Sequence, residues 1–216
     1  MNKKERLVFI TSKLDELFPS PPIPLNHQDA YTLLIAVLLS AQCTDKRVNQ
    51  VTDILFKKAN SPKKMIELGE AQITEIIKPC GFFKTKGRHI FSLSEILLEK
   101  YSGEVPQTFY NLFQSVLYQL PIIFSSLFFM SSQPLSHIFK IPAFPVDTHI
   151  HRLAKRWQLS DGESVEKTER DLKKIFPESA WEKLHLQIIY FGRTYCKARG
   201  HIISDCPICS VIGCKE

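Results

Sequence analysis

At residues 31–39 the chain reads YTLLIAVLL, which is apolar nearly all round when it is wound into a helix. A helix without a polar face has to be covered on every side, so this run predicts a helix inside a hydrophobic core. The polar turn SAQCTD follows at residues 40–45, and either Thr44 or Asp45 can cap the next helix. We expect the buried face of that next helix to comprise Val48, Val51, Ile54 and Leu55.

Helical periodicity extends through the rest of the chain, and no stretch shows sustained period-two alternation with hairpin turns. Ser61 and Pro62 form a helix start, with a hydroxyl cap and a proline at the first helical position. Ser164 can cap a later helix, and residues 181–191 predict a last long helix that stops before Gly192. The sequence therefore predicts an all-α protein.

Composition places the chain among ordinary globular proteins, with 216 residues, 44% of them hydrophobic and 23% charged. The net charge of +6 suits a polyanionic partner, because lysine and arginine that neutralise phosphates release counterions. The N-terminal sequence MNKKERLVFITSK lacks the apolar core of a signal peptide. We therefore expect a cytoplasmic protein, associated with the nucleoid if the partner is DNA.

The middle of the chain departs from this pattern. Residues 105–139 contain no Asp, Glu, Lys or Arg, and residues 104–161 contain no glycine. Residues 110–130 have about the ~20-residue length of a membrane span, but polar residues and Pro121 interrupt them and the longest apolar run is four residues. We expect buried or disordered local structure here and no membrane contact.

Four cysteines cluster near the C-terminus with the spacing C-x9-C-x2-C-x4-C, namely Cys196, Cys206, Cys209 and Cys214. Without a secretion signal, such clustering favours metal binding over disulfides. A zinc ribbon would more usually show two C-x2-C pairs, and only one is present, so the pattern favours an iron-sulfur centre with zinc as the alternative. Four unliganded thiols are the remaining interpretation.

The loop between the first two cysteines carries Lys197, Arg199 and His201. We expect these three side chains to project from a metal-held loop toward DNA phosphates.

A second candidate site is Asp147, in the sequence FPVDTHI at residues 144–150. Apolar residues follow it at helical spacing, so the aspartate stands at a helix N-terminus. Taken alone, such a residue is a helix cap that accepts hydrogen bonds from free amide groups. A carboxylate in this position can also stabilise a developing cation or activate water.

In this order, LLSAQ-x-TD near residue 40, GEVP at 103–106, VDTH at 146–149 and the cysteine cluster resemble the endonuclease III family of helix-hairpin-helix DNA glycosylases. The resemblance implies two helical domains around a DNA-binding cleft, with a C-terminal iron-sulfur loop at 196–214. The domains implied are a six-helix barrel at 24–138, anomalous at 105–141, and a helical domain built from 1–23 and 139–216. It also implies a monomer that binds double-stranded DNA containing a damaged base or an abasic site.

The resemblance assigns roles to particular residues. Asp147 matches the family's catalytic aspartate, and Gln42 matches the residue that fills the gap left when the damaged nucleotide leaves the base stack. Ser40 and Asp45 are candidates for the pocket wall, and Lys197 and Arg199 for phosphate contacts. The four cysteines match the ligands of a [4Fe-4S] cluster, although the common family spacing is C-x6-C-x2-C-x5-C, which Cys214 fits least well.

The family's nucleophilic lysine is not found. It belongs to a glycine hairpin, LPGVG-[RK]-KTA, 18 residues before the aspartate, where this chain has Phe129. Lys140 is the only lysine in the interval and lies only seven residues before Asp147. A pair of compensating frame shifts is one hypothesis for the change. Resequencing the gene tests it, and confirmed codons 105–141 with no LPGVG-like segment in another frame would exclude it.

These observations leave four functions open. The family implies a glycosylase and abasic-site lyase that acts on oxidised pyrimidines, in which a lysine amine attacks C1′ and forms a Schiff base. Without the lysine, Asp147 could activate water in a lyase-deficient glycosylase. The third possibility is a catalytically inactive DNA-binding protein with the metal centre, or a decayed gene product, and the fourth is a zinc-bound helical adaptor.

Overall fold

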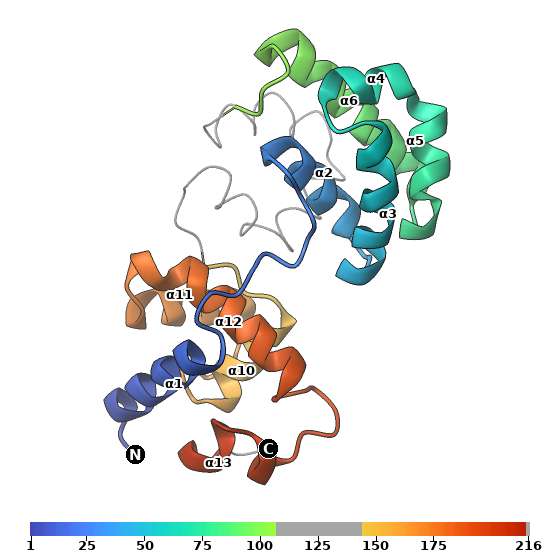
Figure 1. Cartoon of the computed structure of the whole chain (residues 1–216). Coiled ribbons are helices and arrows are strands. Elements are labelled where there is room, and N and C mark those ends of the chain that lie inside the picture. Colours follow the sequence, from blue (N-terminus) through green and yellow to red (C-terminus); the bar gives the residue numbers. More distant parts are fainter. Residues whose placement is uncertain (107–143, 215–216) are drawn as a thin grey trace. The chain divides into compact units, whose positions relative to one another are not determined.

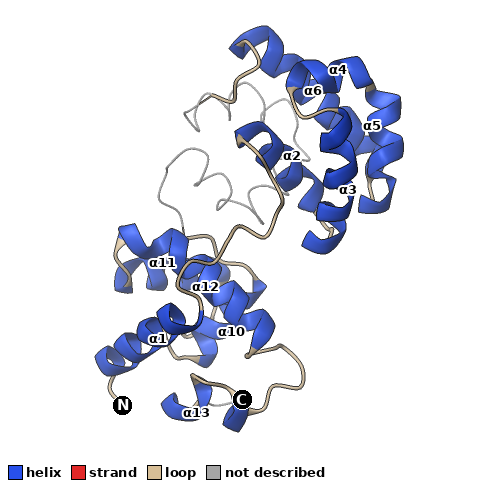
Figure 2. Cartoon of the chain, in the orientation of Figure 1, coloured by secondary structure: helices blue, strands red, loops and turns tan. Residues whose placement is uncertain are grey.

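The protein is described by a computed structural model that covers residues 1–106 and 144–214. Within these two ranges every regular element is a helix (Figures 1 and 2), which confirms the all-α fold class. Residues 107–143, which include Phe129, Lys140 and most of the segment without charged residues, lie outside the described residues. The chain divides into a central unit, Ile23–Ile141, and a terminal unit that joins Met1–Pro22 to Pro142–Glu216. The domain boundaries inferred from the resemblance, at 24 and 138, stay a prediction.

Five α-helices and one short 3-10 helix form the described part of the central unit. They are α2 (Ala30–Ser40), α3 (Asp45–Lys58), α4 (Pro62–Leu68), α5 (Glu70–Ile77), η1 (Lys78–Cys80) and α6 (Phe83–Tyr101). Every residue of α2 from Tyr31 to Ser40 is buried, as its apolar run predicts. Helix α2 packs against α3 and α6, and its apolar residues form a large part of the core of this unit.

Local capping explains where these helices begin. Thr44 rather than Asp45 caps α3, and Ser61 caps α4 with Pro62 at its first position, as predicted. The expected buried face of α3 is wrong at one residue, because Ile54 is 55% exposed. Leu55, the next residue along the helix, is fully buried as predicted. Periodicity alone did not show that only one of these two adjacent apolar residues faces the core.

The terminal unit contains the first helix and the C-terminal ones. They are α1 (Lys3–Leu17), α10 (Thr148–Arg156), α11 (Val165–Ile175), η3 (Glu178–Ala180), α12 (Trp181–Thr194), η4 (Ile203–Asp205) and α13 (Cys209–Ile212). Its core includes Trp157 and Phe191, whose rings meet edge to face with centroids 5.5 Å apart. Gln187 joins α12 to the N-terminal helix, because its amide donates to Asp15 Oδ1 at 2.8 Å and to the Phe18 carbonyl at 2.9 Å.

The prediction that the last long helix stops before Gly192 is wrong, since α12 continues to Thr194. Gly192 lies inside α12, where this helix packs closely against α10, and does not end the helix. A Cβ atom at this position would lie 3.1 Å from His149 Nδ1 and 3.3 Å from Arg152 Nη2 on α10. The glycine therefore lets α10 and α12 approach each other beside the cysteine cluster.

Among the described residues, no helix is both long enough and apolar enough to cross a membrane. Residues 110–130, the stretch of spanning length, fall outside that part of the chain.

Candidate active site and metal centre

The turn after α2 presents the candidate DNA-contacting residues of the central unit. Gln42 is exposed and adopts a left-handed backbone conformation with φ of 53°. Ser40, by contrast, is buried, and its hydroxyl donates to the Val37 carbonyl of its own helix at 2.7 Å. Asp45 is half-buried in the first turn of α3. The turn thus places these three residues at the junction of two helices, and Gln42 is the most exposed of the three.

A buried lysine, which the sequence pattern did not single out, holds this turn. The ammonium of Lys86 on α6 donates to the carbonyl oxygens of Leu39, Ala41 and Cys80 at 3.0, 2.8 and 3.0 Å. Burial lowers the pKa of Lys86. Three carbonyls match the three protons of an ammonium group, so Lys86 ties the C-terminal end of α2 to the end of η1. The available signal was its place on the buried face of α6, between Phe83 and Ile90.

In the terminal unit, Asp147 is the N-cap of α10, where its Oδ1 accepts from the Ile150 amide at 2.7 Å. The residue is half-buried, and its neighbours Phe144 and Val146 anchor the approach to the helix in the core. Asp147 is therefore a helix cap, as one of the two interpretations of the sequence predicted. Only one carboxylate oxygen makes this cap, which is compatible with chemistry at the other.

His185 on α12 lies beside this aspartate and was also missed from the sequence. Its Nδ1 is 2.9 Å from the carbonyl oxygen of Pro145, two residues before Asp147. Burial lowers the pKa of His185 to about 4, and the negative charge of Asp147 opposes that shift only in part. His185 is therefore a neutral group next to the candidate catalytic carboxylate at neutral pH.

Two arginines on α10 tie the helix of Asp147 to the first cysteine. Arg152 Nη2 donates to the Cys196 carbonyl at 3.0 Å, while Arg156 Nη1 donates to the Cys196 sulfur at 3.1 Å and to the Lys197 carbonyl at 3.3 Å. Their four-residue spacing puts both side chains on one face of the helix. That spacing was the sequence signal for a shared partner.

The structure brings all four clustered cysteines into the buried part of the terminal unit. The sulfurs of Cys196 and Cys209 lie 3.8 Å apart, and the Cys209 amide donates to the Cys206 sulfur at 3.5 Å. The pKa of Cys206 is lowered because the thiols of Cys196 and Cys209 donate to its sulfur, and the pKa of Cys196 is raised by the same interaction. Such a set of converging thiols fits a metal centre.

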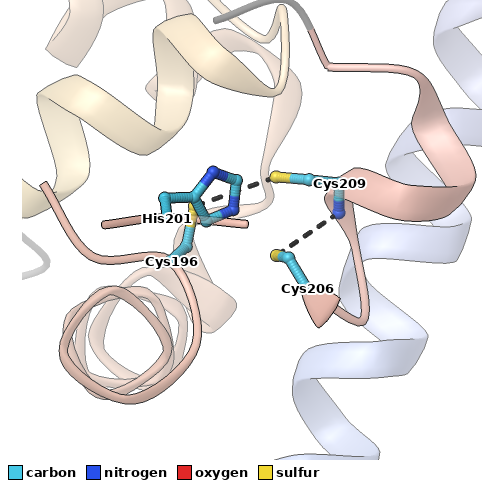
Figure 3. A group of neighbouring side chains, drawn as sticks. All are labelled: Cys196, His201, Cys206 and Cys209. Atoms are coloured by element: carbon cyan, nitrogen blue, oxygen red, sulfur yellow. Dashed lines mark hydrogen bonds between the residues drawn. The ribbon is translucent and has the colours of Figure 1, made fainter. Parts of the chain in front are cut away.

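The loop between Cys196 and Cys206 differs from expectation at His201. Lys197 and Arg199 are exposed, in keeping with an outward position. His201, however, is half-buried and points toward the sulfurs instead of outward (Figure 3). The ligand atoms of Cys196, His201, Cys206 and Cys209 all lie within 4.8 Å of one another. The prediction that His201 projects toward phosphates is therefore wrong.

Known proteins of one family resemble this chain in sequence. A family model described as "HhH-GPD superfamily base excision DNA repair protein" matches residues 35–178. The chain is 37% identical to endonuclease III of Escherichia coli (strain K12), over 100% of this chain and 98% of that protein. It is 33% identical to endonuclease III of Bacillus subtilis (strain 168), over 98% and 93% respectively.

Two solved structures resemble the protein along nearly its whole length. One is "Structure of a non-covalent Endonuclease III-DNA Complex", with a TM-score of 0.80 and 33% identity, covering 100% of this chain and 97% of that one. The other is "Structure of a Trapped Endonuclease III-DNA Covalent Intermediate: Estranged-Adenine Complex", with a TM-score of 0.77, 33% identity and coverage of 96% and 94%.

Proposed function

Because the chain belongs to the endonuclease III family of the HhH-GPD superfamily, we propose that it excises oxidised pyrimidines from double-stranded DNA through Asp147. Members of this family are glycosylases and abasic-site lyases of base-excision DNA repair. The observation that carries the proposal is the position of Asp147, a half-buried carboxylate at the N-terminus of α10 that spends one oxygen on the cap. The other oxygen can face a reacting sugar.

Asp147 would act on the glycosidic bond of a nucleotide that has left the duplex. Cleavage of that bond develops positive charge on the sugar ring, which a nearby carboxylate stabilises, and the same carboxylate can orient a nucleophile toward C1′. Neutral His185 adds no competing positive charge beside it. The cap hydrogen bond holds the carboxylate in one orientation. A catalytic group that is already oriented lowers the entropic part of the activation barrier.

We further propose that Gln42 enters the space vacated by the extruded nucleotide, with Ser40 and Asp45 in the wall of the pocket. An exposed side chain on a turn clamped by Lys86 is suited to this, because insertion into a base stack requires a rigid support. Lys197 and Arg199, both exposed, would contact phosphates. We place this activity at the nucleoid in the cytoplasm and expect a monomer.

The proposed cofactor is a [4Fe-4S] cluster in the terminal unit. Buried thiols, the Cys209 amide that donates to a sulfur, and the arginine that donates to Cys196 fit the donor set of such a group. Cys196, Cys206 and Cys209 would hold it, and the family resemblance implies Cys214 as the fourth ligand. When bound, the cluster would fix the C-terminal loop in place. Brown protein with visible absorbance and bound iron supports the cluster, whereas colourless protein with bound zinc contradicts it.

A second candidate is a glycosylase without lyase activity, and a specific observation favours it. Position 129, where the family has its nucleophilic lysine, is phenylalanine, which cannot form a Schiff base. In that case Asp147 would activate water, which would attack C1′ and displace the damaged base. The abasic site would remain in the DNA, with both strands intact.

One assay separates these functions. Purified protein is incubated with duplex containing thymine glycol or an abasic site, with and without borohydride. Base release with no trapped adduct supports the second candidate, whereas a trapped adduct shows an amine nucleophile and supports the full family activity. Lys140→Ala is the matched variant, because loss of the adduct would identify that lysine. Binding without base release contradicts both candidates and indicates an inactive DNA-binding protein.

A further inference from the structure

Two cysteines of the central unit take no part in the C-terminal cluster and contact each other. Cys43 belongs to the turn after α2 and is half-buried, whereas Cys80 ends η1 and is buried. They are 37 positions apart in the chain, yet their thiols share a hydrogen bond. Neither forms a disulfide, and both pack against the core of the same unit. The fold thus brings two free thiols into contact.

Hydrogen bonds of the main chain hold both members of this pair. The Lys86 ammonium donates to the Cys80 carbonyl at 3.0 Å and to the carbonyl of Ala41, two residues before Cys43, at 2.8 Å. The Cys43 amide donates to the Ser40 carbonyl at 3.0 Å, which closes the turn. The contact between the two thiols is therefore fixed by the backbone and does not depend on the two side chains alone.

The two thiols differ in their access to solvent and in their state of protonation. Burial and the nearby Cys43 raise the pKa of Cys80 to about 12, although the positive charges of Lys86 and Arg47 oppose this shift. Cys80 is therefore a protonated thiol at neutral pH and reacts poorly with oxidants from solution. Cys43 is the more exposed of the two. An accessible cysteine beside a second cysteine that can resolve it is the arrangement that redox-sensing proteins use.

We propose that Cys43 and Cys80 are a redox-sensitive pair that a peroxide joins in a disulfide, and that this bond weakens binding of damaged DNA by the Gln42 turn. Formation of the disulfide is independent of the proposed function, whereas its effect on binding rests on the proposed role of Gln42. In a reducing compartment such a bond is transient, because cellular thiols reduce it again.

The reaction has two steps. The Cys43 thiolate attacks one oxygen of the peroxide, the O–O bond breaks, and Cys43 becomes a sulfenic acid while the other oxygen leaves as water. The Cys80 sulfur then attacks the Cys43 sulfur, the S–O bond breaks, and the departing hydroxide leaves as water with the proton of the Cys80 thiol. In total, two thiols lose two electrons to hydrogen peroxide, and one disulfide and two waters form.

The disulfide changes the turn that carries Gln42. A sulfur-sulfur bond is about 2.05 Å long, so the two sulfurs move closer than hydrogen-bonded thiols and Cys43 is drawn toward η1. Gln42 is the residue directly before Cys43 and has a left-handed backbone with φ of 53°. The turn therefore moves toward the protein and takes the Gln42 side chain with it, which opposes insertion into DNA.

Peptide mapping detects the disulfide without reference to any activity. Full-length protein is treated with hydrogen peroxide, alkylated under denaturing conditions and digested with trypsin. Trypsin cleaves after Lys and Arg but not before Pro79, so Cys43 lies in peptide 14–46 and Cys80 in peptide 65–84, each without another cysteine. We expect these two peptides to be joined, and dithiothreitol to separate them. Peptides that stay separate, or a sulfinic acid at Cys43 with Cys80 alkylated, overturn the proposal.

A binding titration tests the effect on the turn. Peroxide should lower the affinity of the parent for duplex with an abasic site about fivefold or more, and dithiothreitol should restore it. Cys43→Ser is the matched control, because its C-terminal cysteines meet the same oxidant while the disulfide cannot form. We expect its affinity to change by less than about twofold, and the same for Cys80→Ser.

Two results would overturn the effect on binding. One is an equal loss of affinity in the parent and in Cys43→Ser, which would assign the loss to the C-terminal cluster. The other is unchanged affinity in protein whose disulfide the peptide map has shown. If reduced protein does not prefer damaged over undamaged duplex, the proposed function fails instead, and the peptide map still decides whether the disulfide forms.

Discussion

The ammonium nitrogen of Lys86 lies 2.8 Å from the carbonyl oxygen of Ala41, although the two residues are 45 positions apart in the chain. Together with the Leu39 and Cys80 carbonyls, this contact fixes the end of the buried helix α2 directly before Gln42. The geometry of the candidate DNA-contacting turn is therefore set by a residue of another helix.

We expect Lys86→Met to lower the free energy of unfolding by about 1 to 3 kcal/mol, because three inward-facing carbonyls lose their donor. Denaturant unfolding of the two proteins measures the difference. Lys84→Met, on the same helix but exposed, is the matched control and should change the free energy by less than about 0.5 kcal/mol. Equal effects of the two substitutions would show that the Lys86 contacts contribute no net stability.

Gln42→Gly should separate binding from stability. Glycine adopts a positive φ without strain, so we expect no loss in the free energy of unfolding. The side chain that would fill the base stack is removed, and we expect affinity for duplex with an abasic site to fall about tenfold, or roughly 1.4 kcal/mol. The measurement is a binding titration with damaged and undamaged duplex of the same sequence. An equal loss of affinity for damaged and undamaged duplex would show that Gln42 contacts the DNA backbone without regard to damage.

Asp147 can be tested with two substitutions. In Asp147→Asn the side-chain oxygen still caps α10, so we expect stability within about 0.5 kcal/mol of the parent and base release slower by about 100-fold or more. Asp147→Ala removes both the cap and the charge, and should cost about 1 kcal/mol of stability in addition. Thermal unfolding and a single-turnover excision assay give the two readouts. Excision at the parental rate by Asp147→Asn would refute a catalytic role for the carboxylate.

His185 predicts a pH dependence of stability. Its pKa is about 4 in the folded protein and 6.5 when the ring is freely exposed to water, so between these values the unfolded chain binds more protons than the folded one. Stability therefore rises with pH across this window, and acidification from about pH 7 to about pH 4 should cost about 3 kcal/mol through this group. Chemical denaturation at a series of pH values measures this.

The comparison variant is His185→Asn, whose side-chain amide can replace Nδ1 as donor to the Pro145 carbonyl. Between about pH 7 and about pH 4, the parent should lose about 3 kcal/mol more of its free energy of unfolding than the variant does. If both proteins lose stability equally between these pH values, His185 is not buried in the neutral form.

Arg156 provides a test of the metal centre that does not depend on its fourth ligand. Its hydrogen bond stabilises negative charge on the Cys196 sulfur, so Arg156→Met should speed metal loss to a chelator about tenfold and make the reduction potential of a cluster more negative. Lys155→Met, exposed on the same helix, is the control. If Arg156→Met changes neither the reduction potential nor the rate of metal loss, the hydrogen bond from Arg156 to Cys196 is absent in the metal-bound protein.

Local signals in the sequence predicted much of this fold. Ser61, Pro62 and Ser164 begin helices because hydroxyl caps and an N-terminal proline act on the nearest backbone amides. The same rules predict a helix stop at Gly192, and that prediction failed because the glycine lets a neighbouring helix approach. The predictions for Ile54 and His201 failed for a related reason. Neither helical periodicity nor a position in a loop determines which way a side chain points.

By itself, the sequence determined the helical class, the capping roles of Ser61, Asp147 and Ser164, and the grouping of cysteines at one end of the chain. These depend on interactions within a few residues, which the order of amino acids specifies directly. Only the tertiary structure decided that Lys86 holds the turn before Gln42, that Arg156 reaches the Cys196 sulfur and that His201 faces the thiols. These contacts join residues whose separation along the chain carries no information about their separation in space, because packing of whole helices and closure of a loop bring them together.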